Sequence, residues 1–330
     1  MAEPDRVVAL AGGVGGAKLA HGLQARLGDR LIVIVNTGDD LERHGLLVMP
    51  DHDTVMYTLA GIANRQWGWG IEGETFAATE MLARLGEPTW FRLGDRDLAT
   101  HITRTARLRG GAGLTKVCLG LQRSLGVEAT ILPMTDEPLR TEVRTDDGWL
   151  EFQDYFVGRH QEPEVYEVRF RGADLAGAAP GVVEALDAAD AIVITPSNPI
   201  VSIGPILAID EIRNGVARAR GRGVPVVAVS GIVGGKALKG PADRMLTSLG
   251  HASSALGVAR LYADLATDFV LDSVDAGLEP AIAALGLRTH VTDTIMTDDA
   301  GRARLAVEVL AAAGVDPTAP MPPPGDPLGV

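Results

Sequence analysis

The sequence has 330 residues, a net charge of −13 at neutral pH and 46% hydrophobic residues. This length and hydrophobic content fit two domains, or one large α/β domain with an insertion, around a sizeable core. The acidic balance excludes a broad basic face for nucleic acid, and no stretch is long and apolar enough to cross a bilayer.

The first part of the chain predicts the start of a parallel sheet. Residues 7–11 form an apolar run typical of a buried strand, residues 17–27 a helix, and residues 31–40 a second buried strand that ends in a polar loop. A strand, a glycine-rich loop, a helix and a strand in this order open a doubly wound α/β fold. Three more helices are expected next, at residues 53–62, 75–85 and 97–108.

The middle of the chain has alternating, strand-like patterns. They lie at residues 128–134, 139–157 and 164–170, and "TDDGW" (145–149) supplies a hairpin turn. We predict a smaller α+β region, residues 131–171, set on the main sheet.

Alternating strands and helices then return. Strands are predicted at residues 191–199, 224–232, 268–273 and 288–294, and helices at 180–187, 205–219, 240–249, 253–265 and 299–313. We therefore predict a Rossmann-like, three-layer αβα fold with a doubly wound, mostly parallel sheet, built from residues 1–130 and 172–314. The proline-rich tail, residues 315–330, is predicted to be disordered.

The loop "AGGVGGAKL" is the first candidate binding site. Glycines at 12, 13, 15 and 16 let the backbone approach an anion, and the helix that follows offers free N–H groups and a positive dipole end. Lys18 adds a charge, although it breaks the strict dinucleotide-binding pattern, and no Walker A sequence is present. The alternatives are a plain strand-to-helix turn and a lysine that faces solvent.

Four carboxylates follow soon after this loop. Asp39 and Asp40 end the second strand in "NTGDD", and Asp51 and Asp53 belong to "PDHDT". Strand ends line the ligand crevice of a doubly wound sheet, and so many like charges need a cation, which predicts Mg²⁺. The alternative is that these residues cap turns, with Asp53 and Thr54 capping the next helix.

Further polar loops are candidates for the same crevice. Ser197 and Asn198 in "TPSNPIVSIGPI" follow a strand, and "SGIVGGKALKG" (230–240) is a second glycine and lysine loop. "FRLGDRDLATH" (91–101) is dense in charge, and the tryptophans of "RQWGWGIEGET" (65–75) are candidates for stacking on a flat ring. Each segment also fits an ordinary surface loop or ordinary packing.

The single cysteine, Cys118, suits a reducing cytoplasm. No signal peptide is apparent, because charged residues precede only a short apolar run. A cytoplasmic location is expected.

Several of these blocks together resemble one known family. "AGGVGGAKL", "NTGDD", "PDHDTVMYTL", "WGWGIEGETF", "LGDRDLATHI", "LPMTDEP", "FQDYFV", "PSNPIVSIGPIL" and "DTIMTD" occur in the order seen in the 2-phospho-L-lactate transferase (CofD) family of coenzyme F420 biosynthesis. The resemblance runs from about residue 7 to about residue 313.

The resemblance implies an activity. Family members join the phospho-acid moiety of a guanylylated donor, such as lactyl-2-diphospho-5′-guanosine, to the ribityl hydroxyl of the deazaflavin 7,8-didemethyl-8-hydroxy-5-deazariboflavin (Fo), and GMP leaves. They need Mg²⁺, have a Rossmann-like core and are typically homodimers. The acid of the donor is not readable from the sequence, since phospholactate, phosphoenolpyruvate and 3-phosphoglycerate derivatives are all used in the family.

Site residues follow from the resemblance and from the loops above. Asp53 and Arg92 match the family positions that contact the deazaflavin. Asp40 and Asp53 are the expected catalytic or metal-binding carboxylates. The guanosine diphosphate moiety is assigned to Gly12, Gly13, Gly15, Gly16, Lys18, Ser197 and Asn198.

Two other functions remain open. A nucleotide-sugar-binding regulator of the gluconeogenesis-factor type shares the glycine loop but is not expected to carry "LGDRDLATH" and "FQDYFV". An NAD-dependent dehydrogenase fits the Rossmann-like start of the chain. Lys18 and the acidic loop after the second strand argue against this function. NADH binding in the micromolar range would separate the dehydrogenase from the others.

Overall fold

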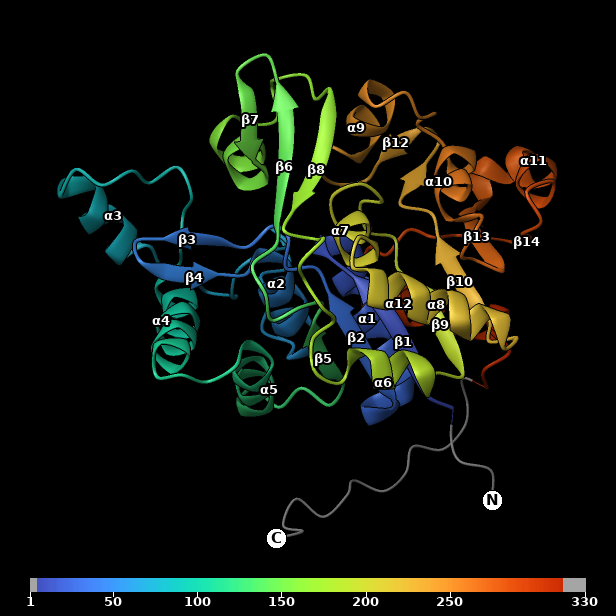
Figure 1. Ribbon diagram of the computed structural model, residues 1–330, viewed down its shortest axis with the longest axis horizontal. Helices are drawn as coiled ribbons and strands as arrows, with labels where there is room; N and C mark the ends of the chain where they lie inside the picture. The colour runs from blue at the N-terminus through green and yellow to red at the C-terminus, as the bar shows by residue number, and fades with distance from the viewer. Residues whose placement is uncertain (1–4, 317–330) are drawn as a thin grey trace, which may run out of the picture.

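Seven parallel strands form the centre of the molecule. The computed structural model describes residues 5–316 (Figure 1). The strand order is β14-β13-β10-β9-β1-β2-β5, and all neighbours are parallel. The bounds are β1 (Val7–Ala11), β2 (Leu31–Val35), β5 (Thr130–Pro133), β9 (Ala191–Ile194), β10 (Val226–Val229), β13 (Asp268–Asp272) and β14 (Arg288–Thr292). The order reverses between β1 and β9, so the predicted doubly wound sheet is confirmed, with its switch point there.

Helices cover both faces of this sheet. Val7 and Ala9 of β1 belong to one core cluster, and Val8 and Leu10 to another. The first cluster packs against α1 (Gly13–Leu27), α2 (Pro50–Leu59), α5 (Leu114–Ser124) and α12 (Asp299–Ala312). The second packs against α6 (Val182–Asp187), α7 (Ile203–Leu207), α8 (Asp210–Gly221), α9 (Ala242–Ser248), α10 (Ala255–Tyr262) and α11 (Glu279–Ala283). Because both faces of a strand are buried, near-continuous apolar runs such as "LIVIV" are what this sheet requires.

A small antiparallel sheet stands above the carboxyl ends of the main strands, at the top of Figure 1. Its order is β7-β6-β8, with β6 (Arg140–Thr145), β7 (Gly148–Glu151) and β8 (Glu167–Arg171). The hairpin turn expected at "TDDGW" is confirmed by the pairing of Thr145 with Gly148. The strand expected to reach residue 157 is wrong, because Asp154–Gly158 is helical. One turn there stacks Phe156 on Phe152, with ring centroids 5.4 Å apart.

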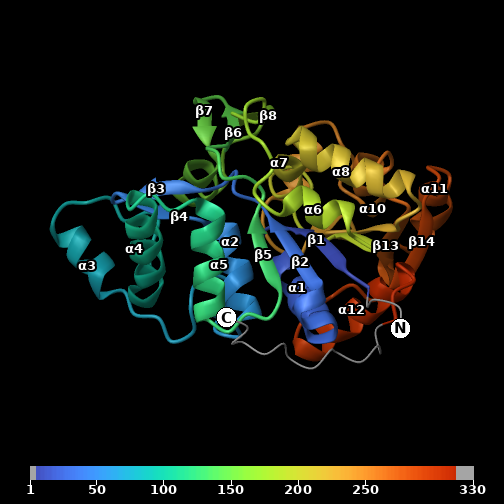
Figure 2. The same cartoon turned by 60° about the horizontal axis from the view of Figure 1, so that its bottom comes forward.

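An arm projects to the left in Figures 1 and 2. It consists of the hairpin β3 (Leu41–Arg43) and β4 (Leu46–Val48) with α3 (Ala77–Arg84) and α4 (Asp95–Arg109). Leu41, Val48 and Leu93 form its small core. A further hairpin, β11 (Ile232–Val233) and β12 (Lys236–Ala237), follows β10, and short 3₁₀ segments occupy Gly28–Arg30 and Ser273–Leu278.

Several predicted boundaries differ from the structure. Helix α1 starts at Gly13, four residues earlier than predicted, because the glycines form its first turn. Strand β5 joins the edge of the main sheet beside β2, whereas the sequence pattern grouped it with the small region. The sequence pattern also missed α5, and it joined α7 and α8, which are separate, into one helix. Residues 317–330 of the predicted disordered tail lie outside the described residues.

Gly22 allows the close crossing of α1 and α12. A Cβ atom at this position would lie 2.2 Å from the backbone oxygen of Arg302. We expect Gly22→Ala to lower the free energy of unfolding by about 1–3 kcal/mol, because the helices must move apart. Gly221→Ala is the control, since its Cβ would meet nothing within 4 Å at the end of α8, and it is expected to be neutral or stabilising. Urea unfolding of the two variants tests this, and an unchanged midpoint for Gly22→Ala would contradict it.

Candidate functional site

A cavity of about 600 Å³ lies at the switch point of the sheet. It is bordered by the first turn of α1, by α2 and α4, and by the loops that follow β2, β9, β10 and β14. Its volume falls in the usual range for a small-molecule site, and its place is the one where doubly wound sheets bind ligands. Both halves of the sheet therefore contribute to one site.

The first turn of α1 packs tightly against the loop after β9. The Ser197 hydroxyl accepts a hydrogen bond from the Gly12 N–H (3.1 Å) and donates one to the Gly12 carbonyl (2.6 Å). A Cβ atom at Gly15 would lie 2.3 Å from the Pro196 carbonyl oxygen. A side chain at Gly15 would therefore prevent this contact. With the two segments packed in this way, Gly13 and Gly15 at the helix N-terminus line the cavity.

Two lysines line the cavity beside this helix N-terminus. Lys18 Nζ donates to the Met296 carbonyl at 2.9 Å, and Lys239 Nζ donates to the Trp67 carbonyl. Within residues 5–316, neither ammonium makes an ion pair with a carboxylate. Burial lowers the pKa of both groups, and for Lys18 the nearby Arg302 and Lys239 lower it further. The positive charge is therefore available to an anion in the cavity.

Asp39 and Asp51 form a buried acidic pair at the cavity wall. The Asn36 amide donates to Asp51 Oδ2 at 2.9 Å, and one oxygen of Asp39 has no hydrogen-bond partner within the described part of the chain. Burial raises the pKa of Asp51 to about 6, against the effect of Asn36 and of the Gly13 N–H. Burial and the neighbouring Asp51 raise the pKa of Asp39 well above its usual range. Burial therefore disfavours two negative charges on this pair, and a cation bound there would relieve their repulsion.

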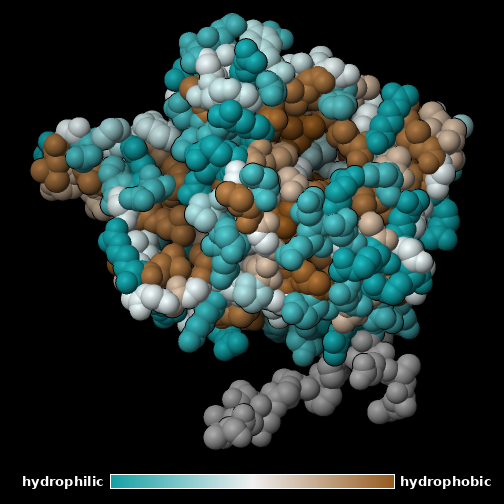
Figure 3. All heavy atoms as spheres, viewed as in Figure 1, coloured by the Kyte–Doolittle hydropathy of each residue, from teal (hydrophilic) through white to brown (hydrophobic). Residues whose placement is uncertain are grey.

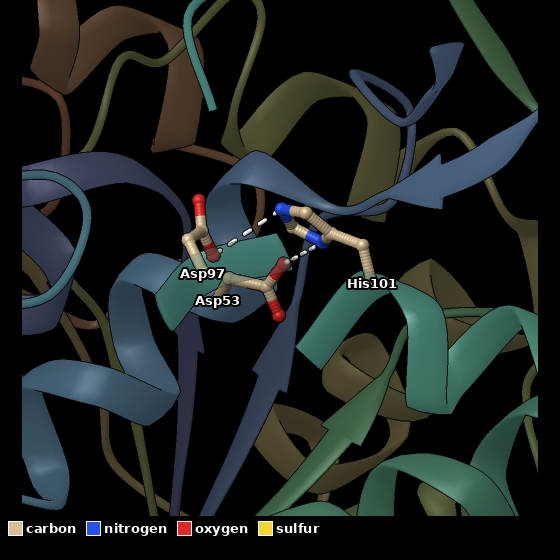
Figure 4. Close-up of side chains that lie close together, drawn as sticks. All are labelled: Asp53, Asp97 and His101. Atoms are coloured by element: carbon tan, nitrogen blue, oxygen red, sulfur yellow. Dashed lines mark ion pairs between the residues drawn. The ribbon is translucent and has the colours of Figure 1, made fainter. Parts of the chain in front are cut away.

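Asp53 lies in the first turn of α2, where it also lines the cavity. Arg104 of α4 binds both of its oxygens, through Nη1 to Oδ2 at 3.1 Å and through Nη2 to Oδ1. His101 Nδ1 lies 3.6 Å from Asp53 Oδ2, and its Nε2 lies 3.2 Å from Asp97 Oδ1 (Figure 4). Burial alone would raise the pKa of Asp53, but Arg104, with help from the histidines, lowers it well below its usual range.

Aromatic side chains form another part of the wall. Trp69, Trp90, Phe91, Phe152 and Phe156 all line the cavity, and Trp69 and Trp90 are 42% and 38% exposed. The guanidinium of Arg92, also at the wall, lies 4.0 Å from the ring centroid of Phe76. This part of the wall fits a flat, partly apolar ring.

Residues 7–312 match the model of the family described as 2-phospho-L-lactate transferase CofD. The chain belongs to this family. A phosphoenolpyruvate transferase of Streptomyces griseus is 44% identical over 315 residues, which cover 93% of this chain and 98% of that protein. A 2-phospho-L-lactate transferase of Methanosarcina acetivorans is 41% identical over 292 residues, covering 88% and 94%. The predicted family is confirmed, and the protein is a transferase.

A solved structure shares the fold. The crystal structure of a UPF0052-family protein from Bacillus halodurans aligns with a TM-score of 0.63 over 93% of this chain and 99% of its own, at 14% identity. At this identity the likeness supports the Rossmann-like architecture alone. In addition, no helix within residues 5–316 has the length and apolar character needed to cross a bilayer.

Most of the residues that the sequence assigned to the CofD site lie at the cavity. Those at its wall are Gly12, Gly13, Gly15, Lys18, Asp53, Arg92, Ser197 and Asn198. Asp40 and Gly16 are not at the wall, and Asp40 is 5% exposed. Asn198 uses its Oδ1 to accept from the Ile200 N–H at 2.9 Å, and Ser197 is bound to Gly12, so both side chains also hold the loop in place.

Asp97 and His101 lie in the segment 91–101 that was predicted to border the crevice without a role for either residue, whereas Arg104 was missed. The three residues follow an i, i+4, i+7 spacing on α4, which places them on one face of the helix. That spacing is visible in the sequence, but only the tertiary structure shows that these side chains reach Asp53 and Tyr57 of α2.

The acidic pair predicts a pH dependence of stability. A carboxyl with a raised pKa in the folded protein stabilises the fold below its unfolded pKa near 4, and this contribution is lost as the pH rises through about 6. We therefore compare the free energy of unfolding of the wild type with that of Asp51→Asn, without divalent cations. The wild-type value minus the Asp51→Asn value is expected to fall by roughly 2–3 kcal/mol between pH 4 and pH 7. Asp174→Asn, an exposed substitution, is the control, and parallel wild-type and Asp51→Asn profiles in urea unfolding would contradict the assignment.

Proposed function

We propose that this protein transfers the phospho-acid moiety of a guanylylated donor to the ribityl hydroxyl of Fo, which gives a coenzyme F420 precursor and releases GMP. The observation that carries the proposal is that one cavity combines a helix N-terminus with an aromatic wall and with two lysines that make no ion pair within residues 5–316. The helix N-terminus and the lysines suit a diphosphate, and the aromatic wall suits a deazaflavin ring. The relatives named as phosphoenolpyruvate and 2-phospho-L-lactate transferases support the same reaction type.

The diphosphate of the donor is assigned to the N-terminus of α1. Free N–H groups and the positive end of a helix dipole bind phosphate well, and Lys18 and Lys239 add two charges. A protein with a net charge of −13 needs such a local positive field to bind a polyanion.

The deazaflavin is assigned to the aromatic wall beside Arg92 and Asp53. A ring stacked there brings its ribityl chain toward the carboxylate of Asp53, which accepts a hydrogen bond from the reacting hydroxyl. The hydroxyl oxygen then bonds to the acid-side phosphorus, and the bond from that phosphorus to the GMP oxygen breaks. GMP takes the electron pair, and the hydroxyl proton is lost to solvent.

Mg²⁺ is proposed as the cofactor, with Asp39 and Asp51 as its fitting residues. The two carboxylates repel each other, and one oxygen of Asp39 has no hydrogen-bond partner among residues 5–316, so a hard cation suits the pair. The expected pair of Asp40 and Asp53 fits less well, since Arg104 already neutralises Asp53 and Asp40 lies outside the wall. Bound at Asp39 and Asp51, Mg²⁺ would supply neutralisation of the diphosphate charge.

A homodimer in the cytoplasm is also proposed, as the family resemblance implies. Met81 and Leu85 at the end of the projecting α3 are 50% and 72% exposed, and Figure 3 shows hydrophobic residues there. An apolar surface of this kind suits a contact between subunits. Light scattering after size exclusion measures the oligomeric state.

The transfer reaction is tested by one assay. We expect GMP release and a new deazaflavin product by mass when the protein is mixed with Fo, Mg²⁺ and one of the three guanylylated donors. The donor that reacts identifies the acid. Nucleotide binding without turnover on any donor would instead support the regulator, and micromolar NADH binding would support the dehydrogenase.

Arg92→Ala is expected to weaken deazaflavin binding. Its guanidinium lines the cavity and stacks on Phe76, so its loss should raise the KM for Fo about tenfold, with a smaller effect on kcat. Arg96→Ala is the matched control, because Arg96 is exposed, is not at the cavity wall and donates to the Glu72 carbonyl. Steady-state kinetics in Fo measures both, and equal KM values for the two variants would contradict the assignment of Arg92.

A further inference from the structure

Arg104 is an unusual residue in this fold. Its side chain is fully buried, and it is the largest side chain with that property within residues 5–316. Burying a guanidinium costs several kcal/mol unless a carboxylate and further acceptors compensate it. Asp53, its partner, lines the cavity, whereas Arg104 does not. The structure therefore holds a site carboxylate from the side away from the ligand.

The geometry of the pair fixes the carboxylate. Nη1 lies 3.1 Å from Asp53 Oδ2, and Nη2 contacts Oδ1. Such a two-pronged contact defines the plane of the carboxylate as well as its position. Nη1 also donates to the Leu47 carbonyl at 3.2 Å, which ties the guanidinium to β4. Each carboxylate oxygen keeps a second lone pair for another donor.

Neighbouring side chains support this arrangement. The Tyr57 hydroxyl donates to Asp97 Oδ1 at 2.6 Å, and His101 lies between Asp97 and Asp53. His101 Nδ1 lies 3.3 Å from Arg104 Nη1. The titratable or charged groups near Asp53, from α2, α4 and the loop after β2, are Asp40, His52, Tyr57, Asp97, His101 and Arg104. Arg104 is the only one of them that carries a positive charge at every accessible pH.

We propose that Arg104 is a positioning residue for the transfer, which holds the Asp53 carboxylate in the orientation that accepts the reacting hydroxyl of the acceptor substrate. This inference rests on the proposed function. Lysine cannot replace the fork of a guanidinium, because an ammonium binds one oxygen as a point charge. A small misplacement of a group that aligns a nucleophile costs up to a hundredfold in rate.

The test is a set of variants at both positions. Arg104→Lys keeps the charge, and Arg107→Lys is the matched control on an exposed position of the same helix. We expect Arg104→Lys to keep a folded protein, by thermal unfolding, and to bind Fo within threefold of wild type, but to lose 10–100-fold in kcat. In the Asp53→Asn background, Arg104→Gln should cost less than a further threefold in kcat, because Arg104 acts through Asp53.

A purely structural role gives a different result. In that case Arg104→Lys would keep both the thermal stability and the kcat of the wild type. A folded Arg104→Lys with wild-type kcat therefore overturns the proposal. If Arg104→Gln lowers kcat as strongly in the Asp53→Asn background as it does in the wild type, the proposal is overturned as well. Absence of turnover in the wild type would overturn the transfer reaction and this role with it, so the two failures are distinguishable.

A second measurement does not depend on the folding of any variant. In a crystal structure of the wild type with Fo, we expect an Asp53 oxygen within hydrogen-bond distance of the ribityl hydroxyl while Arg104 still binds both oxygens. A broken contact between Arg104 and Asp53, or a hydroxyl that lies elsewhere, contradicts the proposal.

Discussion

The structure depends on a close contact between the first turn of α1 and the loop after β9. Strands β1 and β9 are neighbours at the point where the strand order reverses, so the segments that follow them meet above the sheet. The contact is possible because Gly12 and Gly15 have no side chains, and Ser197 joins the two segments by hydrogen bonds. It directs the N-terminus of α1 toward a cavity, which is lined there by Gly13, Val14 and Gly15. The position of the site is thus a consequence of how the sheet is wound.

The acidic residues around this cavity are compensated in two different ways. Asp53 is neutralised by the buried Arg104, which keeps it ionised and in a fixed orientation. Asp39 and Asp51 make no ion pair with a cationic side chain in the described part of the chain, and burial favours their protonated forms. The four carboxylates look equivalent in the sequence but differ in their chemistry. Asp40, the remaining one, lies away from the cavity wall. A fixed anion suits the orientation of a hydroxyl, whereas an uncompensated pair suits a divalent cation.

Membership of the CofD family gives these features a common purpose. Transfer of a phosphorylated acid, for which the family is named, requires alignment and charge neutralisation more than covalent catalysis. The cavity offers both, with cationic groups around the helix N-terminus and an aromatic wall with Arg92 and Asp53. The relatives of similar identity include transferases named for two different phospho-acids, so the identity of the donor depends on details of the cavity that overall similarity does not report.

The sequence by itself determined the class of fold, the family and most of the residues at the cavity wall. Apolar runs with the period of buried strands, glycines at a strand-to-helix turn and polar strand ends are local patterns, and local patterns survive in a linear sequence. Tertiary structure decided what depends on contacts between distant segments. It moved β5 into the main sheet, gave helical geometry to "FQDYFV", and placed Asp40 away from the cavity wall. Above all, it brought Arg104 to Asp53 across 51 positions of the chain, because the pairing of two buried charges depends on where the fold places α4 relative to α2.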